Sequence, residues 1–239
     1  YSFTNLLIEG DGFEPEVELH EEDILFIVYT SGTTGVPKGA AISHRAEFQR
    51  CIAQMATFST LLNVDEEDAY IARDPFFHMA SIDLMFGTHF MGGKVIILAG
   101  FNPAEIVDVM EINKVSWLCM APGMYQPLID ELKSRSKPIR GLKAIGAMAD
   151  MIPSETIIEI TELTNAPFLN TYGSTEIGMH NITQNYIPVG MKNYKDPHFG
   201  KKEGMFCEIK LVDSDGNEVP QHEPGELVIR TPMMFRLNL

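Results

Sequence analysis

The sequence is poor in basic residues, in cysteine and in long apolar runs, and each shortage excludes a class of protein. Lysine and arginine total 18 against 33 aspartate and glutamate residues, a formal net charge of −15, whereas a nucleic-acid partner requires clustered basic side chains. The 3 cysteines (Cys51, Cys119 and Cys207) are far apart and lack metal-ligand spacing, which is typical of reduced cytosolic thiols. No apolar run approaches the roughly 18 residues of a membrane span, and no signal peptide follows Tyr1. We therefore expect a cytoplasmic protein that has no transmembrane segment and binds no nucleic acid.

The length and the two ends of the chain set further expectations. With 239 residues, 45% of them apolar, the chain can bury a full core. Eight carboxylates and no lysine or arginine lie between Glu9 and Asp23, so we expect residues 1–22 to be an acidic lead-in or linker in solvent. Because the chain begins without Met and ends on a strand-like segment, we expect it to be a piece of a longer protein.

Predicted strands and helices alternate through most of the chain. Short apolar runs rich in β-branched and aromatic residues predict strands, and apolar residues at helical spacing, with cap signals such as Ser43, predict helices. The predicted strands are 23–30, 39–43, 69–72, 94–98, 115–119, 142–146 and 167–170, and the predicted helices are 43–62, 82–91, 124–132 and 153–163, with one more beginning at Asn102–Pro103. The alternation predicts an α/β fold with a doubly wound, mostly parallel sheet and flanking helices over residues 23–198.

The pattern changes near residue 200. Segments 206–212 and 225–230 alternate polar and apolar residues on either side of a turn at 213–217, which predicts two antiparallel strands. We therefore place a boundary between residues 190 and 200 and expect residues 199–239 to begin a small antiparallel β subdomain.

The segment 27–39 carries the strongest functional signal, because a predicted buried strand runs directly into hydroxyls interleaved with glycines. Glycines let backbone N–H groups turn toward an anion, hydroxyls add donors or a metal ligand, and Lys38 adds a positive charge for phosphate oxygens. The alternative for such a run is a polar turn between strands. Pro37 stands where the common phosphate loop needs glycine, and the strand-like segment 39–43 replaces its helix, so we predict a phosphate-binding, glycine-rich hairpin.

Three further loops are expected at one edge of the sheet, since ligands bind beyond the carboxyl ends of parallel strands. In the loop 170–176, Tyr172 offers a ring for a base and Glu176 an oxygen ligand for Mg²⁺, with a polar turn at the end of a strand as the alternative. The loop 146–150 consists mainly of small residues that allow a ligand to approach the backbone. The loop 75–78 ends in a histidine, which beside aromatic residues is most often structural.

The segment 29–39 (YTSGTTGVPKG) resembles, almost residue for residue, the signature loop of the adenylate-forming enzymes, and 172–176 resembles their second signature, Tyr-Gly-x-Thr-Glu. This superfamily includes acyl-CoA synthetases, adenylation domains of peptide synthetases and beetle luciferases. The resemblance implies that the first loop holds the β- and γ-phosphates of ATP, that Tyr172 stacks on adenine and Thr175 contacts the α-phosphate. Mg²⁺ is implied to bind Thr33 and Glu176. The implied ATP-binding residues are Thr30, Ser31, Gly32, Thr33, Thr34, Gly35, Lys38, Gly146, Ala147, Met148, Asn170, Thr171, Tyr172, Gly173, Ser174 and Thr175.

By the same resemblance, the loop 146–150 lines the adenine and the acyl pocket, although Met148 and Asp150 depart from the family's usual glycines. His78 is implied to lie beside the reacting carboxylate. Peptide-synthetase domains usually carry an aspartate there that pairs with an amino group, so a plain carboxylic acid is favoured over an amino acid. Asp83, a lone acid in a predicted apolar helix, is expected to be an exposed or hydrogen-bonded structural residue, with a substrate contact as the weaker alternative.

The resemblance implies an AMP-forming acid–thiol ligase of the acyl-CoA synthetase type, active in fatty-acid metabolism. A carboxylate attacks ATP to give an acyl-adenylate and pyrophosphate, and CoA then takes the acyl group. An apolar acid is expected from Phe77, Met79 and Met85. The candidate catalytic residues are Lys38, His78, Thr175 and Glu176. The alternatives are an amino- or aryl-acid adenylation domain that loads a carrier protein, and a non-catalytic nucleotide-binding module.

The resemblance covers essentially the whole chain, but that chain corresponds to about the middle of a family member. Segment 225–230 resembles the run that precedes a ribose-binding Thr-Gly-Asp in a β-barrel subdomain, and the sequence contains neither that motif nor the C-terminal domain with its bridging lysine. We therefore expect residues 199–239 to begin the β-barrel subdomain and the 239 residues alone to be inactive or strongly impaired. The sequence leaves open which acid reacts, whether CoA or a carrier protein accepts it, and the oligomeric state, with a homodimer among the alternatives.

Overall fold

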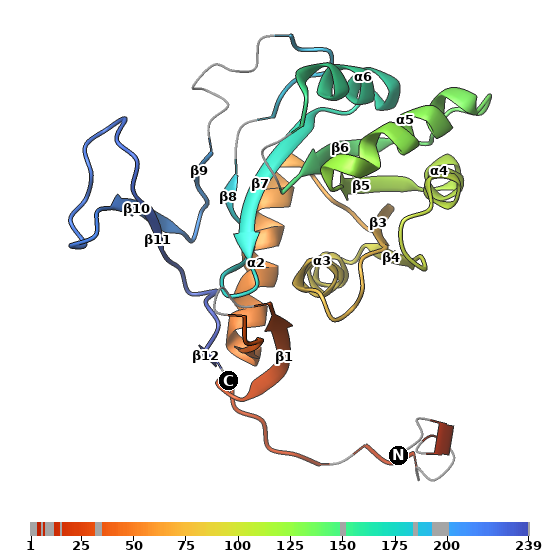
Figure 1. Cartoon of the computed structure of the whole chain (residues 1–239). Coiled ribbons are helices and arrows are strands. Elements are labelled where there is room, and N and C mark those ends of the chain that lie inside the picture. Colours follow the sequence, from red (N-terminus) through yellow and green to blue (C-terminus); the bar gives the residue numbers. More distant parts are fainter. Residues whose placement is uncertain are drawn as a thin grey trace.

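The computed structural model describes residues 4–5, 7, 12–14, 16–31, 35–148, 152–183, 186–192 and 201–238. Its centre is a 7-stranded sheet in the order β4-β3-β5-β6-β7-β8-β9 (Figure 1). The strands are β3 (Asp68–Ala72), β4 (Lys94–Ile97), β5 (Lys114–Cys119), β6 (Leu142–Ala147), β7 (Phe168–Ser174), β8 (Gly178–Thr183) and β9 (Lys202–Glu203). Strands β3 to β7 pair in parallel, and β8 and β9 are antiparallel to their neighbours. The predicted mostly parallel sheet is therefore confirmed.

The strand order reverses at β3, which pairs in parallel with β4 on one side and with β5 on the other. Such a reversal in an open α/β sheet leaves a crevice beyond the carboxyl ends of the strands, because the connections on its two sides leave toward opposite faces. Here the crevice lies after Ala72 and Cys119, the last residues of β3 and β5.

Helices cover both faces of the sheet (Figure 1). They are α2 (His44–Leu61), α3 (Met79–Phe90), α4 (Pro103–Ile112), the 3₁₀ helix η1 (Pro122–Met124), α5 (Tyr125–Ser134) and α6 (Ser154–Thr164). Leu118 of β5 is buried on the face covered by α4, α5 and α6, and its neighbour Trp117 is buried on the face covered by α3, as expected for strand side chains with a period of two. The predicted doubly wound α/β fold is confirmed. None of the helices in the described ranges is long and apolar enough to cross a bilayer.

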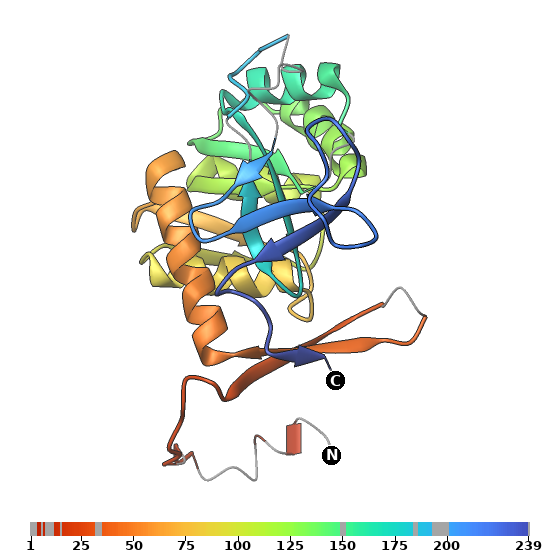
Figure 2. The ribbon, with the colours of Figure 1, turned by 90° about the vertical axis from the view of Figure 1, so that its left-hand side faces the viewer.

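The predicted glycine-rich hairpin is present as β1 (Ile24–Thr30) and β2 (Lys38–Ser43), which pair antiparallel with Thr30 opposite Lys38. Helix α2 follows β2 without a loop, and the Ser43 hydroxyl accepts the Ala46 N–H at 3.2 Å, as predicted for an N-cap. Figure 2 shows α2 running from the hairpin to the central sheet. One continuous helix of 18 residues thus sets the place of the hairpin relative to the sheet.

Residues 201–238 contribute strands to three sheets. Strands β10 (Glu208–Val212) and β11 (Glu226–Arg230) form the predicted antiparallel pair. Strand β9 extends the central sheet beside β8, and β12 (Leu237–Asn238) pairs with β2. The β12 pairing was not predicted, because no local pattern reports contacts between residues so far apart in the chain. The assignment of residues 199–239 to a separate subdomain stays a prediction.

Two predicted segments differ in the structure. Residues 170–174, predicted as a loop, continue β7, since they form a hairpin with β8 in which Thr171 lies opposite Thr183. The turn is thereby confined to residues 175–177. The helix predicted from residue 82 begins at Met79, because the His78 side chain caps its first turn.

Candidate functional site

A cleft of about 550 Å³ opens where the four predicted segments meet. It lies between the β1–β2 hairpin, the start of α3, the end of β6 and the β7–β8 turn. Its lining residues are Thr30, Ser31, Lys38, His78, Met79, Ala80, Met148, Gly173, Ser174, Thr175, Glu176 and Met179. The four candidate catalytic residues of the sequence analysis are all among them, although they come from three separate parts of the chain.

The hairpin places Lys38 directly across from Thr30, whose hydroxyl donates to the Lys38 carbonyl at 3.5 Å. Gly35 is exposed at the tip of the hairpin and does not line the cleft. The predicted residues Gly32, Thr33 and Thr34 lie outside the described residues. The described part of the hairpin therefore brings two hydroxyls and one ammonium group to one wall of the cleft.

The described lining residues of the cleft carry one charge of each sign. Lys38 is exposed and forms no ion pair within the described part of the chain. Glu176, which is half-buried, supplies the carboxylate among the described lining residues. Mg²⁺ is commonly held by one or two carboxylates together with phosphate oxygens. The donor set therefore fits a Mg²⁺ ion that arrives with a polyphosphate, with Lys38 available to the phosphate oxygens.

His78 occupies the N-cap of α3, where its Nδ1 accepts the Ala80 N–H at 3.2 Å. A neutral imidazole that accepts at Nδ1 carries its proton at Nε2. The cap therefore fixes His78 as a donor, and its ring lines both the cleft and a second pocket.

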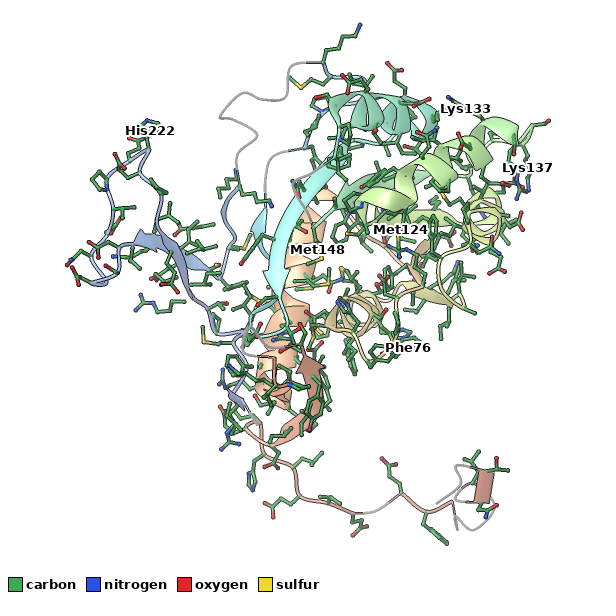
Figure 3. The ribbon with its side chains drawn as sticks, in the orientation of Figure 1. Phe76, Met124, Lys133, Lys137, Met148 and His222 are labelled. Carbon is green, nitrogen blue, oxygen red and sulfur yellow. The ribbon has the colours of Figure 1, made fainter. Side chains whose placement is uncertain are left out.

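The second pocket, of about 250 Å³, lies at the crevice between the ends of β3 and β5. Its lining residues are Tyr70, Ile71, Arg73, Asp74, His78, Ala80, Leu84, Trp117, Leu118, Cys119, Met120, Ala121, Pro122, Met124, Met148 and Met179. Figure 3 shows Met124 and Met148 between α5 and α3, with His222 far from both at the β10–β11 hairpin. Because His78 and Met148 line the cleft as well, the pocket and the cleft adjoin.

The two charged side chains among the described residues of the second pocket pair with each other. Arg73 Nη1 lies 2.8 Å from Asp74 Oδ1, and the same guanidinium donates to the Cys119 carbonyl. Burial raises the pKa of the Cys119 thiol to about 12, so it stays protonated at neutral pH and is a poor nucleophile. The pocket thus offers an apolar site for a ligand rather than a reactive group.

Some predicted residues do not reach the cleft. Tyr172 is 36% exposed and lines a separate pocket, where Lys201 Nζ lies 5.8 Å from its ring centroid. Its neighbour Gly173 lines the cleft instead, since successive strand residues face opposite sides. The residues Gly146, Ala147 and Thr171 are buried in the sheet and Asn170 is half-buried. Of the residues from which an apolar acid was inferred, Phe77 is 78% exposed and Met85 lines neither the cleft nor the second pocket.

Sequence reasoning missed most of the second pocket. Arg73, Asp74 and Met120 follow the last residues of β3 and β5 directly or closely. Position after a strand at the point where the strand order reverses is the signal that would have found them. That signal requires the strand order, which the sequence alone does not report.

Comparisons with known proteins agree on one family. A family profile described as "AMP-binding enzyme" matches residues 4–237. A feruloyl-CoA synthase of Amycolatopsis is 26% identical over 233 residues, which cover 95% of this chain and 45% of the relative. The medium/long-chain-fatty-acid–CoA ligase FadD8 of Mycobacterium tuberculosis is 25% identical over 235 residues, covering 97% of this chain and 40% of the relative. This chain therefore spans less than half the length of these relatives.

A solved structure shows the same fold. The O-succinylbenzoate coenzyme A synthetase of Bacillus subtilis, in complex with ATP and magnesium ion, superposes with a TM-score of 0.80 at 20% identity. The superposition covers 98% of this chain and 47% of that one. At this identity the likeness establishes the fold alone.

Proposed function

This chain belongs to the family of AMP-binding enzymes, and from that premise we propose that it contributes the nucleotide and acid sites of an AMP-forming acyl-CoA synthetase. The observation that carries the proposal is the adjoining pair of sites, a polar cleft with Lys38 and Glu176 and an apolar pocket that meets it at His78. A reaction between a polyphosphate and an acid with an apolar body requires this pair.

In the proposed reaction, a carboxylate oxygen of the acid forms a bond to the α-phosphorus of ATP, and the bond from that phosphorus to the bridging oxygen of pyrophosphate breaks. Lys38 and the hydroxyls of Thr30 and Ser31 bind phosphate oxygens, and Thr175 contacts the α-phosphate. Glu176 would hold Mg²⁺, which would supply charge neutralisation on the phosphates. Because the carboxylate is already ionised, the residues act by positioning the reactants and compensating charge rather than by proton transfer.

The acid is proposed to lie in the second pocket with its carboxylate toward His78. The imidazole, fixed as an Nε2–H donor by its cap, can orient a carboxylate oxygen without removing its charge. The remaining lining is largely apolar, which favours an acid with an apolar body. An amino acid is not favoured, because Asp74, the carboxylate among the described lining residues, is paired with Arg73.

CoA is the proposed acceptor, in a cytoplasmic reaction. The names of several relatives, which are CoA ligases or synthases, support this acceptor over a carrier protein. The described cysteines are free thiols, in keeping with the reducing compartment expected from the sequence.

The test is acid-dependent release of pyrophosphate from ATP by the full-length protein, with fatty, aryl and amino acids, each with and without CoA. Pyrophosphate release with a plain acid, and thioester formation when CoA is added, is the expected result. Pyrophosphate release with an amino acid alone, and no thioester when CoA is added, would favour a carrier protein over CoA as the acceptor. Binding of ATP without pyrophosphate release for any acid would contradict the enzyme and leave a nucleotide-binding module.

A further inference from the structure

Arg50, in the middle of α2, is a buried guanidinium that lies outside the predicted site yet contacts it. The residue is 3% exposed. Nη2 donates to the Thr175 carbonyl at 3.1 Å, Nη1 to Asp83 Oδ1 at 3.3 Å, and Nε to the Met233 carbonyl at 3.1 Å. One side chain therefore connects α2 with the β7–β8 turn, with α3 and with the segment that precedes β12.

The β7–β8 turn, which carries Thr175 and Glu176 into the cleft, is held from outside at several backbone groups. Arg50 binds the Thr175 carbonyl, and the Phe235 N–H donates to the Glu176 carbonyl at 2.7 Å. Asp83 Oδ2 accepts the Met179 N–H at 2.9 Å. The residues on which the proposed reaction depends thus have their backbone placed by groups outside the cleft.

The turn rests directly on the Arg50 side chain. Gly178 has a φ of +78°, and a Cβ atom at this position would lie 2.8 Å from Arg50 Nε. A side chain larger than hydrogen would therefore be strained in its backbone and would collide with the guanidinium. The close approach leaves the turn little freedom to shift while Arg50 stays in place.

Asp83 is the direct partner of Arg50. It is 2% exposed and accepts from both Arg50 and the Met179 N–H, whereas Glu47 Oε2 is 3.9 Å from Arg50 Nη1, beyond hydrogen-bond distance. A buried ion pair is costly to form, and it costs more to break by removing one partner. We infer that the Arg50–Asp83 pair fixes the position of α2 relative to α3, because Asp83 belongs to α3, the helix whose N-cap is His78.

We propose that Arg50 and Asp83 are positioning residues for the nucleotide, which set the distance of Thr175 and Glu176 from Lys38 across the cleft. This inference rests on the proposed adenylation reaction. Neither residue lines the cleft, so both act through the turn. A guanidinium suits this role because its planar fork donates in several fixed directions, which an ammonium group cannot reproduce.

The test compares Arg50→Lys and Asp83→Asn in the full-length protein by steady-state pyrophosphate release, with thermal unfolding measured for each variant. Asp83→Asn keeps the shape and an acceptor for the Met179 N–H, and so serves if Arg50→Lys does not fold. The matched control is Arg135→Lys, which alters an arginine that binds Asp108 and Glu131 on the far side of the sheet from α2 and α3.

We expect both variants to raise KM for Mg·ATP by about ten- to a hundredfold, the effect of a small misplacement of reacting groups. KM for the acid should stay within about twofold of wild type, because the acid pocket does not include the turn. A purely structural role predicts a lower amount of active enzyme with both KM values unchanged, as expected for Arg135→Lys, and that result would overturn the proposal. If the wild-type protein releases no pyrophosphate with any acid, the proposed function fails first and the positioning role fails with it.

Discussion

The two adjoining sites are built in different ways. The acid pocket lies at the ends of neighbouring parallel strands, β3 and β5, so hydrogen bonds of one sheet fix its walls. The cleft is assembled from the β1–β2 hairpin of one sheet, the β7–β8 turn of another and the start of helix α3. What joins these parts is α2 and the contacts of Arg50. The acid site therefore depends on local sheet packing, whereas the nucleotide site depends on a few long-range contacts.

The largest effect is expected from removing the cation of the cleft. In Lys38→Ala the phosphate oxygens lose the charged donor that compensates their negative charge. The value of kcat/KM for Mg·ATP should therefore fall by about 10²–10³-fold. Pyrophosphate release at varied ATP concentration measures this. Lys94→Ala, an exposed lysine at the start of β4, is the control and should match wild type. Unchanged turnover in Lys38→Ala would contradict the phosphate-binding role of the hairpin.

A smaller effect is expected at the carboxylate. Glu176→Gln keeps the size of the side chain and removes its charge, so the Mg²⁺ concentration for half-maximal rate should rise by about thirtyfold, equivalent to about 2 kcal/mol for a contact with a charged group. Saturating Mg²⁺ should restore much of the rate. A titration of Mg²⁺ at fixed ATP measures the shift, and an unaltered Mg²⁺ dependence would remove Glu176 from the metal site.

The acid pocket should respond in selectivity rather than in nucleotide use. Met124 is half-buried and lines this pocket but not the cleft. Met124→Trp narrows the pocket, so the ratio of kcat/KM for a long acid to that for a short acid should fall by about tenfold. KM for Mg·ATP should stay at its wild-type value. A change in KM for ATP without a change in acid preference would show that the two sites are not built independently.

The same contrast explains how much could be predicted from the sequence. Elements whose signals are local were predicted, such as the glycine-rich hairpin, the cap at Ser43 and the helix start at Asn102–Pro103. Asp83, expected to be an exposed or hydrogen-bonded structural residue, is hydrogen-bonded and is buried rather than exposed. Its partner was not predicted, because Arg50 is 33 residues away in the chain and neither residue shows a pattern that names the other.

Site placement divides along the same line. The signature segments predicted that Lys38, His78 and Glu176 would share one site, and the structure brings them to one cleft. Tyr172 was predicted to join them but faces a separate pocket beside Lys201. Motifs report which residue types a reaction requires, whereas the side of a strand on which each residue lies depends on pairing with distant strands. The catalytic and binding roles assigned to these residues stay predictions.

The smallest effect on activity is expected from Glu47, whose change should appear in stability instead. Burial and the nearby charge of Asp83 raise the pKa of Glu47 from 4.5 to about 8, against the opposing charge of Arg50. Cys51 also faces this cluster, and burial raises the pKa of its thiol to about 12, so it stays neutral. Between pH 4.5 and about pH 8, the folded protein keeps a proton on Glu47 that the unfolded chain has lost.

The contribution of Glu47 to the free energy of unfolding should therefore be largest below pH 4.5. It should fall as pH rises toward 8, by up to about 1.4 kcal/mol per pH unit. Glu47→Gln replaces the titrating carboxyl group with a neutral amide. The free energy of unfolding of this variant, relative to wild type, should therefore increase with pH over the same range. Urea unfolding of both proteins across this range measures the slope, with Glu66→Gln, at an exposed turn, as the control. Parallel stability profiles for wild type and Glu47→Gln would contradict the raised pKa. A difference confined to stability would show that the cluster holds the turn through Arg50 and Asp83 rather than through Glu47.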